Sequence, residues 1–266
     1  HPRERAGSRA ARTTPATRGL THLTQGTPTM GRLERKRVLG TQVDDYMGPA
    51  IRDLFTAEAA NVQTWEGAIP EREALTRACR AVGEIDILVA NLAHDPCNTP
   101  VADIDDLDWH NLFDSLVHPL MRLVRHYAPA FAERGHGKIV AITSAAPLRG
   151  IPGSTAYCAS RGAQNAFIRA SGLEFAQHNV QINAIAQNYV SNPAYYPDDL
   201  VETERFQKHL QRNVPIRRIA RPDETAELAL FLASNNSDFI VGQVVPFSGG
   251  WVTTCLLYTS DAADEG

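Results

Sequence analysis

Three residues of this sequence have the types and the spacing of a proton-abstraction site: Ser144, Tyr157 and Arg161. Tyr157 and Arg161 are four residues apart, so on a helix their side chains share one face. A phenol is a weak base at neutral pH because its unperturbed pKa is about 10, but a neighbouring guanidinium favours the phenolate and lowers that pKa. With the hydroxyl of Ser144 to hold a substrate oxygen, the three side chains could remove the proton of an alcohol.

The segments around these residues predict a parallel sheet with the three side chains near its carboxyl edge. Short apolar runs alternate with stretches of helical spacing, which implies a single Rossmann-type α/β domain, a doubly wound parallel sheet with helices on both faces. Strands are expected at 37–41, 61–65, 85–91, 137–143, 180–186 and 242–250, and helices at 47–57, 71–81, 108–134, 155–178 and 221–234. Ser144 then follows the fourth strand, at the edge where open sheets bind ligands. Residues 191–213 are polar and aromatic and are expected to form a lid.

Composition and charge narrow the classes of function. A chain of 266 residues with 43% hydrophobic content suffices for one domain with a substantial core. The formal net charge of −4 gives no reason to expect nucleic acid or a membrane surface as a partner, and no apolar run approaches the length of a membrane span. The four cysteines and nine histidines lack metal-ligand spacing, so we expect no bound metal and a reduced, cytoplasmic setting.

Both ends of the chain look foreign to this domain. Residues 1–29 are rich in Arg, Thr, Pro and Ala without apolar periodicity, and we interpret them as translated upstream sequence or a disordered leader, with a transit peptide as the alternative. Residues 255–266 resemble the translation of a sequencing-library adapter, with a natural disordered tail as the alternative. The Rossmann-type catalytic domain is therefore expected to cover residues 30–254.

The stretch RVLGTQVDDYMG, residues 37–48, is similar to the first strand and turn of a dinucleotide-binding fold but lacks two of its glycines. Such glycines let the backbone approach a pyrophosphate at the following helix N-terminus. Gln42 and Tyr46 stand at those positions and only Gly48 remains. After the second strand, Glu66 is the only candidate for an acidic ribose clamp. These features predict that no nicotinamide cofactor binds.

Over nearly all of residues 31–251 the chain resembles the short-chain dehydrogenase/reductase superfamily, through ILVAN, STAYCASRGA, NVQINAIA and GQVVPFSGGW. The reductases carry lysine where this sequence has Arg161. Two motifs, Thr-x4-Tyr-x-Gly at residues 41–48 and Ser-x12-Tyr-x3-Arg at residues 144–161, are similar to those of the halohydrin dehalogenases. That family comprises cofactor-independent relatives of the reductases.

The resemblance implies a reaction that converts vicinal haloalcohols to epoxides with release of halide. Ser144 and Tyr157 would bind the hydroxyl, Tyr157 would remove its proton, and Arg161 would keep Tyr157 ionised. In reverse, small anions would open epoxides at the same site. The family also implies a homotetramer in which the helices at 108–134 and 155–178 form shared bundles.

A halide site is implied by the same resemblance. In the family, the loop that follows NAIA forms a nest of backbone N–H groups, which binds anions, and aromatic edges present a positive quadrupole to the halide. The residues implied for this site are Tyr46, Gln187, Asn188, Tyr189 and Val190. Tyr195 and Tyr196 are expected to line the substrate pocket. The alternative for these tyrosines is that they only pack in the core.

Two other functions remain open. The first is an ordinary NAD(P)-dependent oxidoreductase with an unusual arginine, which glycines at positions 42 and 46 would have favoured. The second is a catalytically silent Rossmann-fold protein that binds small ligands or regulates a partner. The complete set of Ser144, Tyr157 and Arg161 argues against that second alternative, because a decayed site would lack a member.

Overall fold

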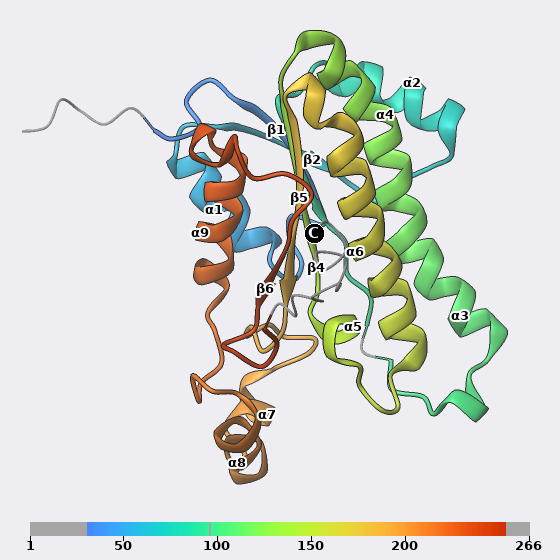
Figure 1. Cartoon of the computed structure of the whole chain (residues 1–266), viewed down its shortest axis with the longest axis vertical. Helices are drawn as coiled ribbons and strands as arrows, with labels where there is room; N and C mark the ends of the chain where they lie inside the picture. The colour runs from blue at the N-terminus through green and yellow to red at the C-terminus, as the bar shows by residue number, and fades with distance from the viewer. Residues whose placement is uncertain (1–30, 96, 254–266) are drawn as a thin grey trace, which may run out of the picture.

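A parallel sheet of six strands, in the order β2-β1-β3-β4-β5-β6, forms the centre of the computed structural model, which describes residues 31–95 and 97–253 (Figure 1). The strands are β1 (Arg37–Thr41), β2 (Asn61–Trp65), β3 (Ile87–Asn91), β4 (Gly137–Ser144), β5 (Val180–Gln187) and β6 (Val244–Phe247). β1 pairs with β2 on one side and with β3 on the other, so the winding of the chain reverses at β1. The predicted doubly wound α/β fold is confirmed.

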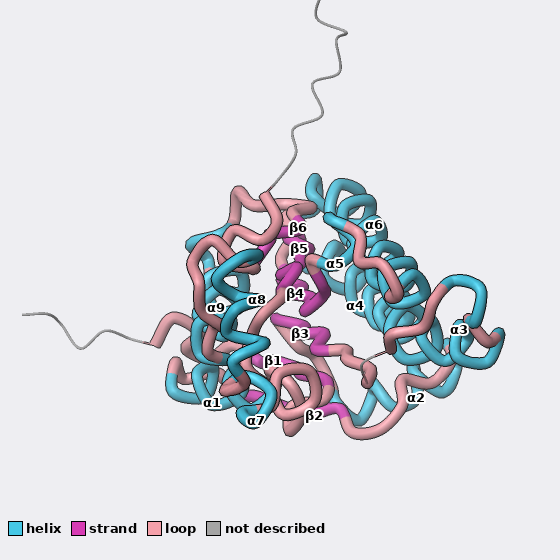
Figure 2. The backbone as a smooth tube through the Cα atoms, turned by 90° about the horizontal axis from the view of Figure 1, so that it is seen from below, coloured by secondary structure: helices cyan, strands magenta, loops and turns pink. Residues whose placement is uncertain are grey.

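Helices cover both faces of the sheet, and each face has its own apolar core (Figure 2). On one face lie α1 (Gly48–Ala57) and α9 (Pro222–Ala233). On the other face lie α2 (Arg72–Val82), α4 (His118–Arg134) and α6 (Thr155–Phe175). The shorter elements are 3-10 turns at Val101–Asp103, Ala176–His178 and Asn235–Ser237, and helices α3 (Asp106–Leu112), α5 (Ala146–Arg149), α7 (Asp198–Val201) and α8 (Glu204–Asn213).

The single helix expected over residues 108–134 is interrupted. A π-helical turn, Phe113–Val117, separates α3 from α4, and Pro119 lies in the first turn of α4. A π turn widens the hydrogen-bond ladder and frees backbone groups for other partners. One of them, the carbonyl oxygen of buried Leu116, accepts a hydrogen bond from Gln164 Nε2 of α6 at 2.7 Å. The interruption therefore connects this helix to the helix that carries Tyr157.

The predicted lid, residues 191–213, contains two helices that the sequence reasoning did not place. α7 and α8 project from the carboxyl edge of the sheet (Figure 1). Thr203 caps α8 by accepting a hydrogen bond from the N–H of Phe206 at 3.2 Å. Leu210 is buried in a small apolar cluster with Tyr189 and Val214. The lid is thus an ordered part of the fold with a core of its own.

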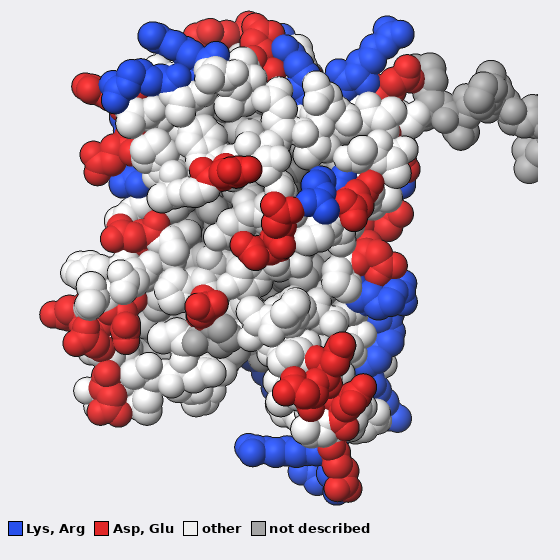
Figure 3. Space-filling model, turned by 180° about the vertical axis from the view of Figure 1, so that it is seen from behind, with Lys and Arg blue, Asp and Glu red and all other residues white. Residues whose placement is uncertain are grey.

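Within the described residues, no helix is long and apolar enough to cross a membrane. The face shown in Figure 3 carries scattered acidic side chains among uncharged ones, and its basic side chains lie mainly near the edges. The predicted terminal segments, 1–29 and 255–266, lie outside the described residues.

Candidate active site

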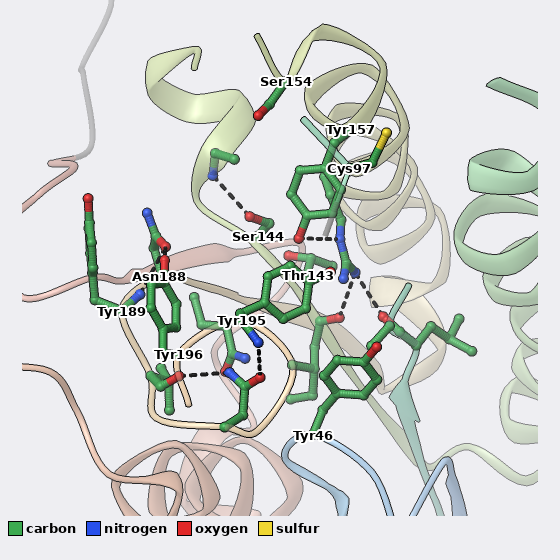
Figure 4. Close-up of a pocket in the computed structure, with 18 of the residues that line it drawn as sticks. Tyr46, Cys97, Thr143, Ser144, Ser154, Tyr157, Asn188, Tyr189, Tyr195 and Tyr196 are labelled. Carbon is green, nitrogen blue, oxygen red and sulfur yellow. Dashed lines mark hydrogen bonds between the residues drawn. The ribbon is translucent and has the colours of Figure 1, made fainter. Parts of the chain in front are cut away.

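A cavity of about 260 Å³ lies at the carboxyl edge of the sheet (Figure 4). Its walls come from the ends of β3, β4 and β5, from α6, from the turn after β1 and from the lid. The residues singled out from the sequence all line this cavity: Tyr46, Ser144, Tyr157, Arg161, Gln187, Asn188, Tyr189, Val190, Tyr195 and Tyr196. The fold therefore brings together side chains that are up to 150 positions apart in the sequence (46 to 196).

Ser144 is the last residue of β4, whereas the sequence predicted that it would follow the strand. Ser144 is 5% exposed. Its Oγ accepts a hydrogen bond from the N–H of Ala146 at 3.1 Å. Its carbonyl oxygen accepts one from Asn165 Nδ2 at 3.1 Å. These contacts fix the serine and leave its hydroxyl hydrogen available for an oxygen in the cavity.

Arg161 is buried, with an exposure of only 4%. Several hydrogen bonds hold it beside Tyr157. Its Nε donates to Tyr157 Oη at 3.1 Å. Its Nη1 donates to the carbonyl of Leu92 at 2.8 Å and to Gln164 Oε1 at 2.9 Å. The guanidinium is thus held in one orientation by α6 and by the segment after β3.

The charge of Arg161 has no carboxylate partner among the described residues, since none of their ion pairs includes it. Buried charges are normally paired. Burial alone would lower the pKa of Arg161, but the phenols of Tyr157 and Tyr195 more than offset burial, so the pKa is raised. A phenolate, or an anion bound in the cavity, is therefore the counter-charge that this guanidinium favours.

The turn between β1 and α1 keeps a glycine-type backbone without the glycines. Gln42 and Tyr46 have φ angles of 45° and 52°, in the left-handed region, which costs about 1–3 kcal/mol for each such non-glycine residue. Asn91 Nδ2 donates to the carbonyls of Gln42 at 2.9 Å and Asp45 at 3.0 Å, which holds the turn in place. Gly48 remains because a Cβ there would lie 2.2 Å from the carbonyl oxygen of Gln42.

The side chains of this turn do not fit the pyrophosphate of a nicotinamide dinucleotide, the cofactor that the fold implies. Gln42 Oε1 accepts a hydrogen bond from the N–H of Ala93 at 2.7 Å, so its amide bridges the turn to the end of β3. Burial, then the charges of Asp95 and Asp45, raise the pKa of Tyr46 to about 12, which reflects an acidic environment. A pyrophosphate would meet an amide, a phenol and carboxylates where it requires glycine backbone.

In the loop expected to form a halide nest, some backbone N–H groups already donate hydrogen bonds to other atoms of the protein. The N–H of Asn188 donates to the carbonyl of Phe247 at 3.0 Å, and that of Tyr189 donates to Asn188 Oδ1 at 2.9 Å. Tyr196 Oη donates to the same oxygen at 2.6 Å. Of the N–H groups of Asn188, Tyr189 and Val190, only that of Val190 lacks an acceptor among the described residues. Of these three N–H groups of the expected nest, residues 187–190, only that of Val190 is therefore free to bind an anion. The N–H of Tyr189 becomes available only if the side chain of Asn188 moves.

Tyr189 has a φ of 55° and is 7% exposed. Its Oη lies 2.8 Å from His209 Nε2 of α8. The ring of Trp251 approaches it edge to face at a centroid distance of 5.8 Å. The ring of Tyr189 is thus part of the packing of the lid as well as a wall of the cavity.

Several polar residues that the sequence reasoning did not single out support the cavity. Asn91 ends a buried apolar strand, and a polar residue at that position is a signal that a pattern search could have used. Gln164 follows Arg161 by three positions, so it shares the face of α6 with the arginine. Asn192 is only 8% exposed, and nothing in its sequence context marked it as buried.

Residues 57–252 match the family model described as enoyl-(acyl carrier protein) reductase. An uncharacterised oxidoreductase from Schizosaccharomyces pombe is 29% identical over 208 residues, which are 76% of this chain and 70% of the relative. A solved structure named "Dehalogenation enzyme" is 27% identical with a TM-score of 0.75, and the match covers 83% of this chain and 99% of that one. A halohydrin dehalogenase bound to ethyl (2S)-oxiran-2-ylacetate is 22% identical with a TM-score of 0.70, over 82% of this chain and 98% of that one, and shows the same fold. By fold and by sequence, the chain belongs to the short-chain dehydrogenase/reductase superfamily.

Proposed function

We propose that this protein is a cofactor-independent halohydrin dehalogenase. The observation that carries the proposal is a buried guanidinium, Arg161, which donates a hydrogen bond to the phenol oxygen of Tyr157 and shares a cavity with Ser144. The filled turn after β1 supports it, because the chemistry must then proceed without a hydride carrier. Similarity at 27% identity to a solved dehalogenation enzyme agrees with this assignment.

In the proposed reaction, the hydroxyls of Ser144 and Tyr157 hold the oxygen of a vicinal haloalcohol. Tyr157, ionised beside Arg161, takes the alcohol proton. The alkoxide oxygen attacks the neighbouring carbon, a C–O bond forms, and the C–halogen bond breaks with its electron pair on the departing halide. The products are an epoxide and a halide ion. The reaction needs no external oxidant or reductant.

The departing halide requires hydrogen-bond donors and positive ring edges close to the reacting carbon. The N–H of Val190 is available at this wall of the cavity, and Tyr46 and Tyr189 can present ring edges to an anion. In the reverse direction, a small anion in the same position attacks the epoxide, and Tyr157 returns the proton to the opened oxygen. Haloalcohols or epoxides, together with halide or other small anions, are the proposed partners.

An NAD(P)-dependent oxidoreductase is the second candidate, and the names of the family model and of the yeast relative favour it. We test the two by incubating the protein with a small bromo- or chloro-alcohol in the absence of nucleotide. Halide release with acidification, lost in Tyr157→Phe, supports the dehalogenase. No halide release, together with nucleotide-dependent reduction of a ketone, overturns it. Neither reaction, with retained binding of a small ligand, favours a silent binding protein.

The same proposal includes a cytoplasmic homotetramer with α4 and α6 in the contacts. Leu173, near the end of α6, is 72% exposed in the single chain, which agrees with a contact there. Light scattering of the purified protein measures the state of assembly directly.

A further inference from the structure

The loop that begins the lid holds Tyr195 in a fixed position over the base. Asn192 Oδ1 accepts hydrogen bonds from the N–H groups of Ala194 at 3.2 Å and Tyr195 at 2.8 Å. Asn192 Nδ2 donates to the carbonyl of Val190 at 2.8 Å. Because one buried amide satisfies three backbone groups of this loop, the backbone of Tyr195 has little freedom.

The ring of Tyr195 lies between two other phenols. Its centroid is 5.8 Å from that of Tyr46 and 6.3 Å from that of Tyr157 (Figure 4). Its hydroxyl donates a hydrogen bond to the carbonyl of His94, in the segment after β3. Tyr195 therefore connects the lid to the opposite wall and places a second phenol beside the base.

The charges around Tyr195 keep its phenol protonated. The titratable groups that line the cavity with it are Tyr46 after β1, Cys97 after β3, Tyr157 and Arg161 on α6, and Tyr189 and Tyr196 after β5. Burial, followed by the charge of Tyr157, raises the pKa of Tyr195, and Arg161 only partly opposes this. Asp95 accepts from Tyr46 Oη at 3.4 Å, which places a carboxylate beside Tyr46. The phenol of Tyr195 is thus held in its protonated form beside Arg161.

We propose that Tyr195 is a positioning residue for the base, a neutral phenol that donates its hydrogen bond to Tyr157 when Tyr157 is ionised. In the resting state the hydroxyl of Tyr195 donates to the carbonyl of His94, and on ionisation it turns to the phenolate. Arg161 and Tyr195 then both donate to the same oxygen. A hydrogen bond to the charged form stabilises that form, so Tyr195 increases the fraction of active base at neutral pH.

The effect of Tyr195 on the reaction rate rests on the proposed function, but the ionisation of Tyr157 can be measured without substrate. The absorbance of phenolate is followed against pH for the wild type and for Tyr157→Phe, and their difference isolates Tyr157. The same pair is then measured in the Tyr195→Phe background, where the ring is kept and only the hydroxyl is lost. We expect the midpoint to move upward by about one pH unit, equivalent to about tenfold less phenolate at neutrality.

Tyr196→Phe is the matched control, because it removes a hydroxyl from the same loop but one that donates to Asn188. Its midpoint should stay at the wild-type value. A second variant, Tyr195→Gln, gives up the ring but keeps a donor, and its midpoint should lie closer to the wild type than that of Tyr195→Phe. An unchanged or lower midpoint in Tyr195→Phe, or an equal shift in Tyr196→Phe, overturns the proposal.

Rates of halide release provide the second readout. If the protein dehalogenates, the pH–rate profile of Tyr195→Phe should move by the same amount as the midpoint. If it releases no halide at all, the proposed function fails, while the phenolate titration still decides the role of Tyr195. A purely structural role for Tyr195 would change thermal stability and leave the midpoint where it is, which counts against the inference.

Discussion

The turn after β1 and the site formed by the end of β4 and the first turns of α6 are held in place in different ways. The turn has a left-handed backbone at Gln42 and Tyr46, and the side chain of Gln42 accepts a hydrogen bond from Ala93, after β3. At the second site, Ser144 and Tyr157 lie beside one buried cation, Arg161. The backbone path of the turn is therefore constrained by its neighbours, because the path also positions α1 and the end of β3.

Energetics explain why the turn persists. Left-handed backbone at two non-glycine residues costs stability, yet hydrogen bonds from Asn91 to two carbonyls and from Ala93 to Gln42 oppose any relaxation. The second site is held differently. Arg161 donates hydrogen bonds to Tyr157, Leu92 and Gln164, so the geometry of the second site depends on this one arginine side chain. Substitutions should therefore affect activity at the second site and stability at the turn.

The largest expected effect is that of Tyr157→Phe. It removes the group that takes the alcohol proton, and loss of a positioned general base costs about 10²- to 10⁴-fold in rate. Halide release in the absence of nucleotide should fall to near background, while the thermal unfolding midpoint stays close to that of the wild type. Cys158→Ser, one position along α6, should leave the rate unchanged. Full activity in Tyr157→Phe would contradict the assigned base.

Arg161→Lys should have an intermediate effect. Lysine keeps a positive charge, but its ammonium cannot reproduce the planar fork that reaches Tyr157, Leu92 and Gln164 together. The phenolate is then stabilised less, so the rise of the pH–rate profile moves to higher pH, with about tenfold lower activity at neutrality for each unit of displacement. The measurement is halide release over a pH series, with chemistry rate-limiting in both proteins. A superimposable profile would mean that the arginine does not tune the base.

Much of this comparison could be predicted from the sequence because it depends on local patterns. Alternating apolar runs gave the sheet, and the spacing of Tyr157 and Arg161 placed both on one face of α6. The missing glycines at 42 and 46 identified the altered turn, whose left-handed backbone the structure then revealed.

Other features depend on contacts between distant segments, which periodicity does not encode. α8 was missed because it buries only one residue, Leu210, so its apolar face is too narrow to signal a helix. The engagement of Tyr189 N–H by the side chain of Asn188 follows from the path of one loop. The contact of Gln164 with Leu116 depends on a π turn in another helix.

A pair of substitutions at Gln42 tests the turn with a smaller expected effect. Gln42→Ala loses the hydrogen bond from Ala93 and keeps the left-handed strain, whereas Gln42→Gly loses the same hydrogen bond and relieves the strain. The glycine variant should therefore be more stable than the alanine variant by about 1 kcal/mol in the free energy of unfolding. Denaturant unfolding of both variants measures the difference. The reverse order, which ordinary helix and strand positions show, would indicate that the turn is not strained.

The smallest expected effect is that of nucleotide on the wild-type protein, for which we expect none. NADH and NADPH should neither raise the thermal unfolding midpoint nor quench protein fluorescence at micromolar concentrations. The reason is local: Gln42 bridges to Ala93, Tyr46 occupies the wall of the cavity, and the carboxylate of Asp45 lies where phosphates would approach. A nicotinamide-dependent reductase titrated in parallel shows that the assay detects binding. Micromolar binding of either nucleotide to this protein would contradict this prediction, because the turn would then accept a dinucleotide despite the side chains of Gln42 and Tyr46.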